Sequence, residues 1–238
     1  MSKCAPFKIV QSLKDTMSQD TWSKVDDYLE HLLIEHDSAL DYALAATAEA
    51  GLPPHLAVSA SQGKFLQMML QIQGAKKVLE IGTLAAYSTI WLARGLPEDG
   101  YLVSLEAVPS NVTIARRNIE HAGLAHKVNI RAGKAMDTLL DVEAEGFAPF
   151  DFIFIDADKS GYKDYVDWAL RLSRPGTVWI MDNVIRGGGI VDMQNNTRTM
   201  TGLREYFEHL SQQDKLTATT MQTVGCKGHD GFTLVRVL

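Results

Sequence analysis

Two segments of the sequence place charged and polar residues directly after a run of apolar ones. Asp156, Asp158 and Lys159 follow FIFI, and the pair Asp182-Asn183 follows VWIM. An ionised carboxylate at the end of a buried strand loses hydration, so it needs a compensating partner. Three oxygen donors on neighbouring strand tips, with positions left for water and substrate, suit Mg²⁺ or a similar hard ion. We therefore predict a divalent metal site at Asp156, Asp182 and Asn183.

A second group of residues predicts a nucleoside site. The run KKVLEIG ends with Glu80 and Gly82, Ser88 stands near the start of the next helical pattern, and YLVSLE ends in Glu106. An acid in this last position commonly accepts hydrogen bonds from two ribose hydroxyls. Gly82 is followed by Thr-Leu-Ala-Ala, so the G-x-G-x-x-G pattern of pyrophosphate binding is absent. A cofactor with an amino-acid moiety and no phosphates suits this loop better.

Each of these motifs also has an ordinary structural interpretation. Glu106 could cap a loop, the DADK sequence could form a solvated turn, and Asp182-Asn183 could be an Asx cap. Lys159 could be a surface lysine, as most lysines are. The placement of both acidic motifs at successive strand ends favours a functional site over these alternatives.

The remaining pattern predicts the sheet that would position these residues. Short β-prone runs at 76–82, 101–106, 127–133, 150–157 and 177–183 alternate with helical patterns, as in parallel βαβ units. Two further runs, 216–224 and 231–238, have no helix between them and predict an antiparallel hairpin. We expect an α/β fold: a doubly wound, Rossmann-like sheet of seven strands, mostly parallel, with an antiparallel C-terminal hairpin strand and helices on both faces.

The first part of the chain has a different character. About 20 residues of weak pattern form an expected arm, and apolar residues at helical spacing then predict one long helix from Asp20 that ends near Gly51. A further helix is expected from a Ser59 cap to Gly74.

The overall composition narrows the partners and the location. The net charge of −6 over 238 residues argues against nucleic-acid binding, which needs a concentrated basic face. No apolar run approaches the roughly 20 residues that cross a bilayer, and the first residues lack the apolar core of a secretory signal. We expect a cytoplasmic protein with no membrane or nucleic-acid partner.

Four motifs together resemble one known family. EIGT…YST, SLE, FIDADK and DNV are similar to the metal-dependent class I S-adenosylmethionine (SAM) O-methyltransferases of the caffeoyl-CoA and catechol type, from about Leu52 to Leu238. The resemblance implies one methyltransferase domain over 1–238, in which segment 1–50 contributes to the acceptor pocket and to a homodimer. It also implies roles for individual residues: Asp156, Asp182 and Asn183 as metal ligands, Lys159 as general base, and Val58, Glu80, Gly82, Thr83, Ser88, Glu106, Ala135, Asp156 and Asp158 as cofactor contacts.

The activity that the resemblance implies is transfer of a methyl group from SAM to one hydroxyl of a metal-chelated aromatic vicinal diol. The cofactors would be SAM and a divalent cation, Mg²⁺ before Ca²⁺ or Mn²⁺. Two alternatives stay open. Ala85 and Ala86 stand where relatives often carry glycine, which would suit a weak or silent cofactor-binding relative. A nucleotide-dependent oxidoreductase is the other alternative, against which the missing glycines argue.

Overall fold

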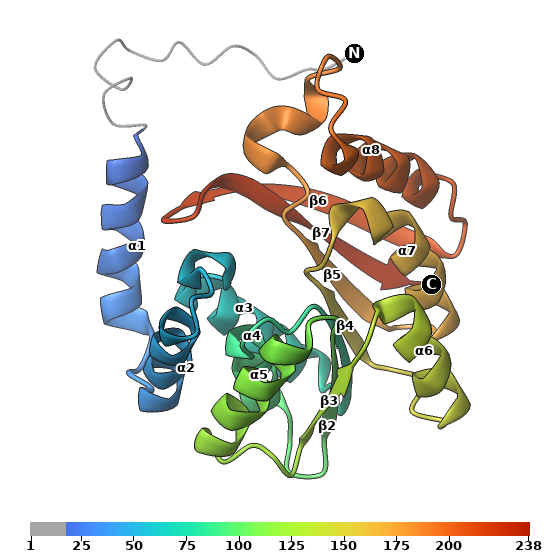
Figure 1. Ribbon diagram of the computed structural model, residues 1–238. Helices are drawn as coiled ribbons and strands as arrows, with labels where there is room; N and C mark the ends of the chain where they lie inside the picture. Colours follow the sequence, from blue (N-terminus) through green and yellow to red (C-terminus); the bar gives the residue numbers. More distant parts are fainter. Residues whose placement is uncertain (1–17) are drawn as a thin grey trace.

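The fold is built on one twisted seven-stranded sheet, seen in a computed structural model that describes residues 18–238 (Figure 1). The strand order is β3-β2-β1-β4-β5-β7-β6. The first five strands run parallel, and β7 is antiparallel to both of its neighbours. This is the predicted sheet. Its strands are β1 (Lys77–Ile81), β2 (Tyr101–Glu106), β3 (Val128–Ala132), β4 (Phe152–Ile155), β5 (Val178–Asp182), β6 (Leu216–Gly225) and β7 (Gly228–Val237).

Helices cover both faces of the sheet, as expected. Alternate strand residues face opposite sides, so Leu79 and Ile81 belong to one buried cluster and Val78 to the other. The first cluster is completed by α6 (Ala135–Ala144), α7 (Tyr162–Arg171) and α8 (Arg198–Ser211). The second is completed by α2 (Ser38–Glu49), α3 (Ala60–Gln73), α4 (Tyr87–Gly95) and α5 (Pro109–His121).

The prediction of one long N-terminal helix was wrong. The segment forms α1 (Gln19–Leu33) and α2, separated by residues 34–37. Asp37 has extended backbone angles and accepts a hydrogen bond from the Ala39 N–H, which begins α2 with an N-cap. Arg94 of α4 pairs with the same carboxylate at 2.6 Å and fixes the break in place. The cap at Ser59 and the end at Gly74, with φ of 67°, are both confirmed.

The C-terminal hairpin is confirmed, but its turn lies earlier than predicted. Gly225 pairs with Gly228, so the turn consists of Cys226 and Lys227 and not of the KGHDG segment. Gly228 has a φ of 89°, a conformation that favours glycine, and β7 continues from there through Asp230.

The order of the strands places a crevice between β1 and β4. The chain leaves β1 toward β2 and later returns to add β4 on the other side, which makes this the switch point where α/β sheets bind ligands. Gly82 follows β1 directly with a φ of 100°, and a Cβ there would lie 2.0 Å from the Asp156 carbonyl oxygen. Glycine is required for this close approach of the two strand ends. Across residues 18–238, no helix is both long enough and apolar enough to pass through a membrane.

Candidate active site

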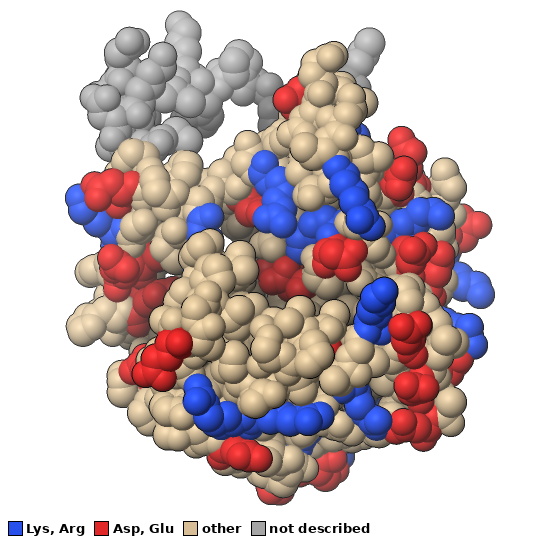
Figure 2. All heavy atoms as spheres, in the orientation of Figure 1, with Lys and Arg blue, Asp and Glu red and all other residues tan. Residues whose placement is uncertain are grey.

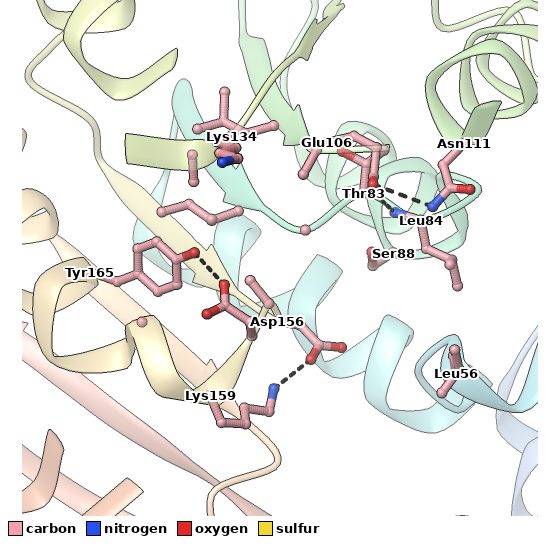
Figure 3. A pocket seen from close by; sticks show the side chains of 18 of the residues that line it. Leu56, Thr83, Leu84, Ser88, Glu106, Asn111, Lys134, Asp156, Lys159 and Tyr165 are labelled. Atoms are coloured by element: carbon pink, nitrogen blue, oxygen red, sulfur yellow. Dashed lines mark hydrogen bonds and ion pairs between the residues drawn. The ribbon is translucent and has the colours of Figure 1, made fainter. Parts of the chain in front are cut away.

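A cavity of about 760 Å³ lies at the carboxyl ends of the parallel strands (Figure 3). The residues after β1, β2, β4 and β5 line it, together with the first turn of α6 and the loop before α3. In Figure 3 Glu106 and Asn111 lie on one side of the cavity, and Asp156 and Lys159 lie on another. Residues of both groups that the sequence singled out therefore line one cavity, although Glu80 and Asp182 are buried and are not among its lining residues.

Glu106 is held in a fixed orientation at the first side. One carboxylate oxygen accepts from the Leu84 N–H at 2.8 Å, and the other accepts from the Val108 N–H at 2.9 Å and the Asn111 amide at 3.3 Å. A carboxylate has about four lone-pair positions, so these three donors leave acceptor capacity for a ligand hydroxyl. The side chain lines the cavity and fits the predicted ribose contact.

Glu80 lies below the cavity and is not one of its lining residues. It is fully buried, and its carboxylate accepts hydrogen bonds from the hydroxyls of Ser88, Thr89 and Ser104 at 2.5–2.6 Å. Burial raises the pKa of Glu80 to about 7, against the opposing effect of these three hydrogen bonds. Ser88 does line the cavity, so the direct effect of Glu80 in this structure is to orient Ser88.

The raised pKa of Glu80 predicts a pH-dependent stability. Since the folded-state pKa lies above the unfolded value, the folded protein binds the proton more tightly and loses stability as pH rises from about 4.5 to 7. For Glu80→Gln we expect this part of the pH dependence to vanish. Between pH 5 and pH 8 the wild type should lose on the order of 2 kcal/mol relative to the variant. Urea unfolding of both proteins at the two pH values measures this difference, and parallel pH profiles would contradict it.

The other predicted cofactor contacts all lie at the cavity, and Ala86, which stands where relatives often carry glycine, does not. Val58, Gly82, Thr83, Ala135, Asp156 and Asp158 all line the cavity. Ala86 has a φ of 70°, the conformation that would favour glycine, but it is fully buried in the core cluster of α3, α4 and α5 and does not line the cavity. Its methyl group therefore does not narrow the predicted cofactor site.

Lys159 is not a surface lysine. Only 4% of the residue is exposed, and its ammonium donates to an Asp156 carboxylate oxygen at 2.8 Å and to the Tyr162 hydroxyl at 2.7 Å. The single proton of the Tyr162 hydroxyl is in turn shared between the carbonyl oxygens of Ile155 and Asp182, at 3.0 and 2.8 Å. Because these carbonyls end β4 and β5, Lys159 and Tyr162 fix the two strand tips beside each other.

The predicted metal ligands lie on these same tips. Asp182 is 4% exposed, and burial followed by the charge of Asp156 raises the pKa of Asp182 to about 7. The Asp182 carboxylate accepts from the Asn183 N–H at 2.8 Å, with Asn183 in a left-handed conformation at φ of 53°. Asp156 and Asn183 line the cavity. Two interacting carboxylates, one of them buried, form an acidic centre at this end.

No cluster of three or more His, Cys, Asp or Glu side chains suited to a metal occurs within residues 18–238. The oxygen donors at this end of the cavity are the carboxylates of Asp156 and Asp182 and the amide of Asn183. This set has fewer charged groups than a cluster of three acidic side chains. That donor set matches a hard cation that keeps several waters. The repulsion between Asp156 and Asp182 is the kind of local charge that such a cation relieves.

Three supporting residues were missed by the sequence analysis. Tyr162 joins the two strand tips, Asn111 holds Glu106, and Tyr165 donates to an Asp158 carboxylate oxygen at 2.7 Å. Tyr162 and Tyr165 stand in a run that reads as an amphipathic helix, YKDYVDWALRL. Their three-residue spacing places both rings on one helix face, which was the only available signal.

The chain is similar to known proteins over most of its length. A family model described as O-methyltransferase matches residues 33–238. The chain is 47% identical over 221 residues to a catechol O-methyltransferase of Niastella koreensis, covering 93% of this chain and all of the relative. It is 46% identical over 213 residues to a catechol O-methyltransferase of Mycobacterium tuberculosis, covering 90% of this chain and 94% of the relative.

A solved structure is similar over the same extent. The crystal structure of an O-methyltransferase from Bacillus cereus in complex with SAH superposes with a TM-score of 0.91 at 50% identity, covering 93% of this chain and all of the other. The fold and the cavity at the switch point define a class I methyltransferase-like domain. The chain belongs to the O-methyltransferase family.

Proposed function

We propose that the protein transfers a methyl group from SAM to one hydroxyl of an aromatic vicinal diol, in a reaction that depends on a divalent cation. One observation supports this most: a single cavity presents Glu106 at one side and the Asp156, Lys159 and Asn183 group at the other. The relatives named catechol O-methyltransferase and the SAH complex of the similar structure support the same activity.

In this proposal the side chains of the protein position the methyl donor and the acceptor and provide charged groups beside them. Glu106 binds the ribose hydroxyls, and Ser88, Val58 and Ala135 shape the remainder of the cofactor site. When bound, SAM supplies a sulfonium-activated methyl group. Holding the methyl donor and the acceptor oxygen in line accounts for much of the rate, because the donor is already reactive.

Asp156, Asp182 and Asn183 would hold the cation beside the acceptor. When bound, the cation would favour loss of a proton from a coordinated phenol. Lys159 is the proposed base for that proton, a role that requires its neutral amine form; the side chain is buried and held beside Asp156 and Tyr162 at this end of the cavity. The diol requirement follows from the donor set, since two adjacent oxygens of the acceptor can complete the coordination of the ion together.

An assay of diols against monophenols tests this function. With SAM and Mg²⁺ we expect methylation of catechol and little or none of phenol, and we expect excess chelator to abolish the catechol reaction. Calorimetry with S-adenosylhomocysteine in chelator should still show binding, because the Glu106 side of the cavity contains no predicted metal ligand. Equal turnover of phenol, or undiminished turnover in chelator, would contradict the proposal.

The homodimer stays a proposal. No residue of α1 is buried, and the helix exposes an apolar stripe of Val25, Tyr28, Leu29, Leu32 and Leu33. Exposed apolar patches of this kind are common at subunit interfaces. Of the described part of segment 1–50, Thr47 lines the cavity, while residues 1–17 lie outside the described structure. Light scattering in solution would give the mass of the assembly.

A further inference from the structure

The loop between β1 and α4 forms part of the cavity wall in a conformation that its residues disfavour. Four consecutive residues of this loop line the cavity: Gly82, Thr83, Leu84 and Ala85. Leu84 and Ala86 have φ angles of 50° and 70°, in the left-handed region that residues other than glycine seldom adopt. Two such residues within three positions need contacts from outside the loop, because the isolated segment would favour other backbone angles.

Glu106 and Asn118 provide such contacts from two different elements. The Glu106 carboxylate, at the end of β2, accepts from the Leu84 N–H at 2.8 Å (Figure 3). The side-chain amide of Asn118, in α5, donates to the Ala85 carbonyl oxygen at 2.8 Å. Ala85 is buried, and within residues 18–238 no backbone N–H donates to this carbonyl. The Asn118 amide therefore satisfies a buried acceptor between the two left-handed residues.

Packing alone does not account for an asparagine at position 118. The residue is fully buried, it does not line the cavity, and its amide oxygen has no hydrogen-bond partner within residues 18–238. An unpaired buried oxygen lowers the stability of the fold, and an apolar side chain would avoid this cost. Ala115 and Ile119, on either side of it in α5, are buried apolar residues. The hydrogen bond to Ala85 is what an apolar residue at this position could not provide.

We propose that Asn118 is a positioning residue for cofactor binding. It holds the loop in the conformation in which the Leu84 N–H orients Glu106, so its effect reaches the ligand through the backbone. Without the amide, the two left-handed residues relax, the Leu84 N–H moves away from Glu106, and ligand binding has to restore both. The inference rests on the proposed function for the identity of the ligand, because Glu106 carries the proposed ribose contact.

Calorimetry with S-adenosylhomocysteine in chelator measures this effect without a diol, a metal or turnover. For Asn118→Leu we expect a dissociation constant about tenfold above the wild-type value, the upper end for one neutral hydrogen bond. Asn118→Ala removes the same donor with less bulk and should show the same loss. Circular dichroism establishes that each variant is folded. Because Asn118 is buried and uncharged, neither change alters the surface charges seen in Figure 2.

A second substitution separates positioning of the loop from packing of the core. In the wild type the loop is already held, so Ala86→Gly should change the affinity by less than about twofold. In the Asn118→Leu protein, glycine at position 86 adopts the φ of 70° without strain and should restore most of the lost affinity. Ala122→Gly is the matched control, because Ala122 follows α5 at a φ of −74° and glycine there should restore nothing.

The outcomes of these measurements are distinct. A wild-type dissociation constant in Asn118→Leu would overturn the inference, as would a loss that Ala86→Gly does not recover, since a packing defect in the core would persist. A wild type that does not bind S-adenosylhomocysteine would overturn it too. Catechol turnover is assayed separately, so its absence would count against the proposed function alone.

Discussion

Replacing Asp182 by Asn is expected to make the protein more stable and far less active. The buried carboxylate is costly because burial and the charge of Asp156 raise its pKa to about 7. Asn keeps the shape and the oxygen that accepts from the Asn183 N–H. At pH 8 we expect a gain on the order of 2 kcal/mol in the free energy of unfolding, shrinking as pH falls from 7 toward 4.

The same substitution should reduce catechol turnover by at least about a hundredfold, since a catalytic cation contributes several kcal/mol. Affinity for S-adenosylhomocysteine should stay near the wild-type value. Asp141→Asn, at an exposed position of α6, is the control and should change neither property. A stable Asp182→Asn protein with full turnover would show that Asp182 is not required for the reaction.

Lys159→Arg should preserve the ion pair with Asp156 and still lose activity. Arginine keeps the positive charge, but it does not release its proton at any pH used for proteins, so it cannot serve as a base. Loss of a general base costs roughly 10²–10⁴-fold in turnover. Some loss of stability is also expected, because the residue is 4% exposed and the guanidinium is larger.

Two measurements separate a base from a fixed charge at this position. Lys163→Arg, at an exposed position on α7, is the matched control and should retain activity. Circular dichroism and S-adenosylhomocysteine binding establish that Lys159→Arg is folded before its rate is compared. If Lys159→Arg kept most of the wild-type rate, Lys159 would act through its charge and the base would have to be another group.

The sheet was predictable because its pattern is local. Apolar runs such as FIFI and VWIM end at the carboxyl edge, and parallel strands bring their ends together at that edge. The break between α1 and α2 was not predictable from periodicity alone, because apolar residues continue at helical spacing across it. It depends on Asp37 as a cap and on its pairing with Arg94, 57 residues away in the sequence. The predicted hairpin turn lay too late in the chain. Gly225 and Gly228 stand among other turn-forming residues, and the sequence alone does not show which residues close the hairpin.

The candidate site was also predictable only in part: residues at strand ends were recognised from the sequence, and the residues that support them were not. Glu106 and Asp182 end their strands, and Asp156 and Asn183 come directly after theirs, so the types and positions of these residues carried the signal. Tyr162 did not, because its hydrogen bonds to the ends of β4 and β5 exist only after those strands are paired. The position of Glu80 below the cavity likewise depends on which way its side chain leaves β1. Such supporting contacts are tertiary, and a motif does not contain them.

A crystal structure with S-adenosylhomocysteine, Mn²⁺ and a catechol would show whether the ends of β4 and β5 share a cation, because anomalous scattering locates the ion. We expect one manganese peak bonded to Asp156, Asp182 and the Asn183 amide oxygen, with both catechol oxygens completing its coordination and the Lys159 amine within hydrogen-bond distance of one of them. A catechol bound in the cavity with no ion between Asp156 and Asp182 would contradict this expectation.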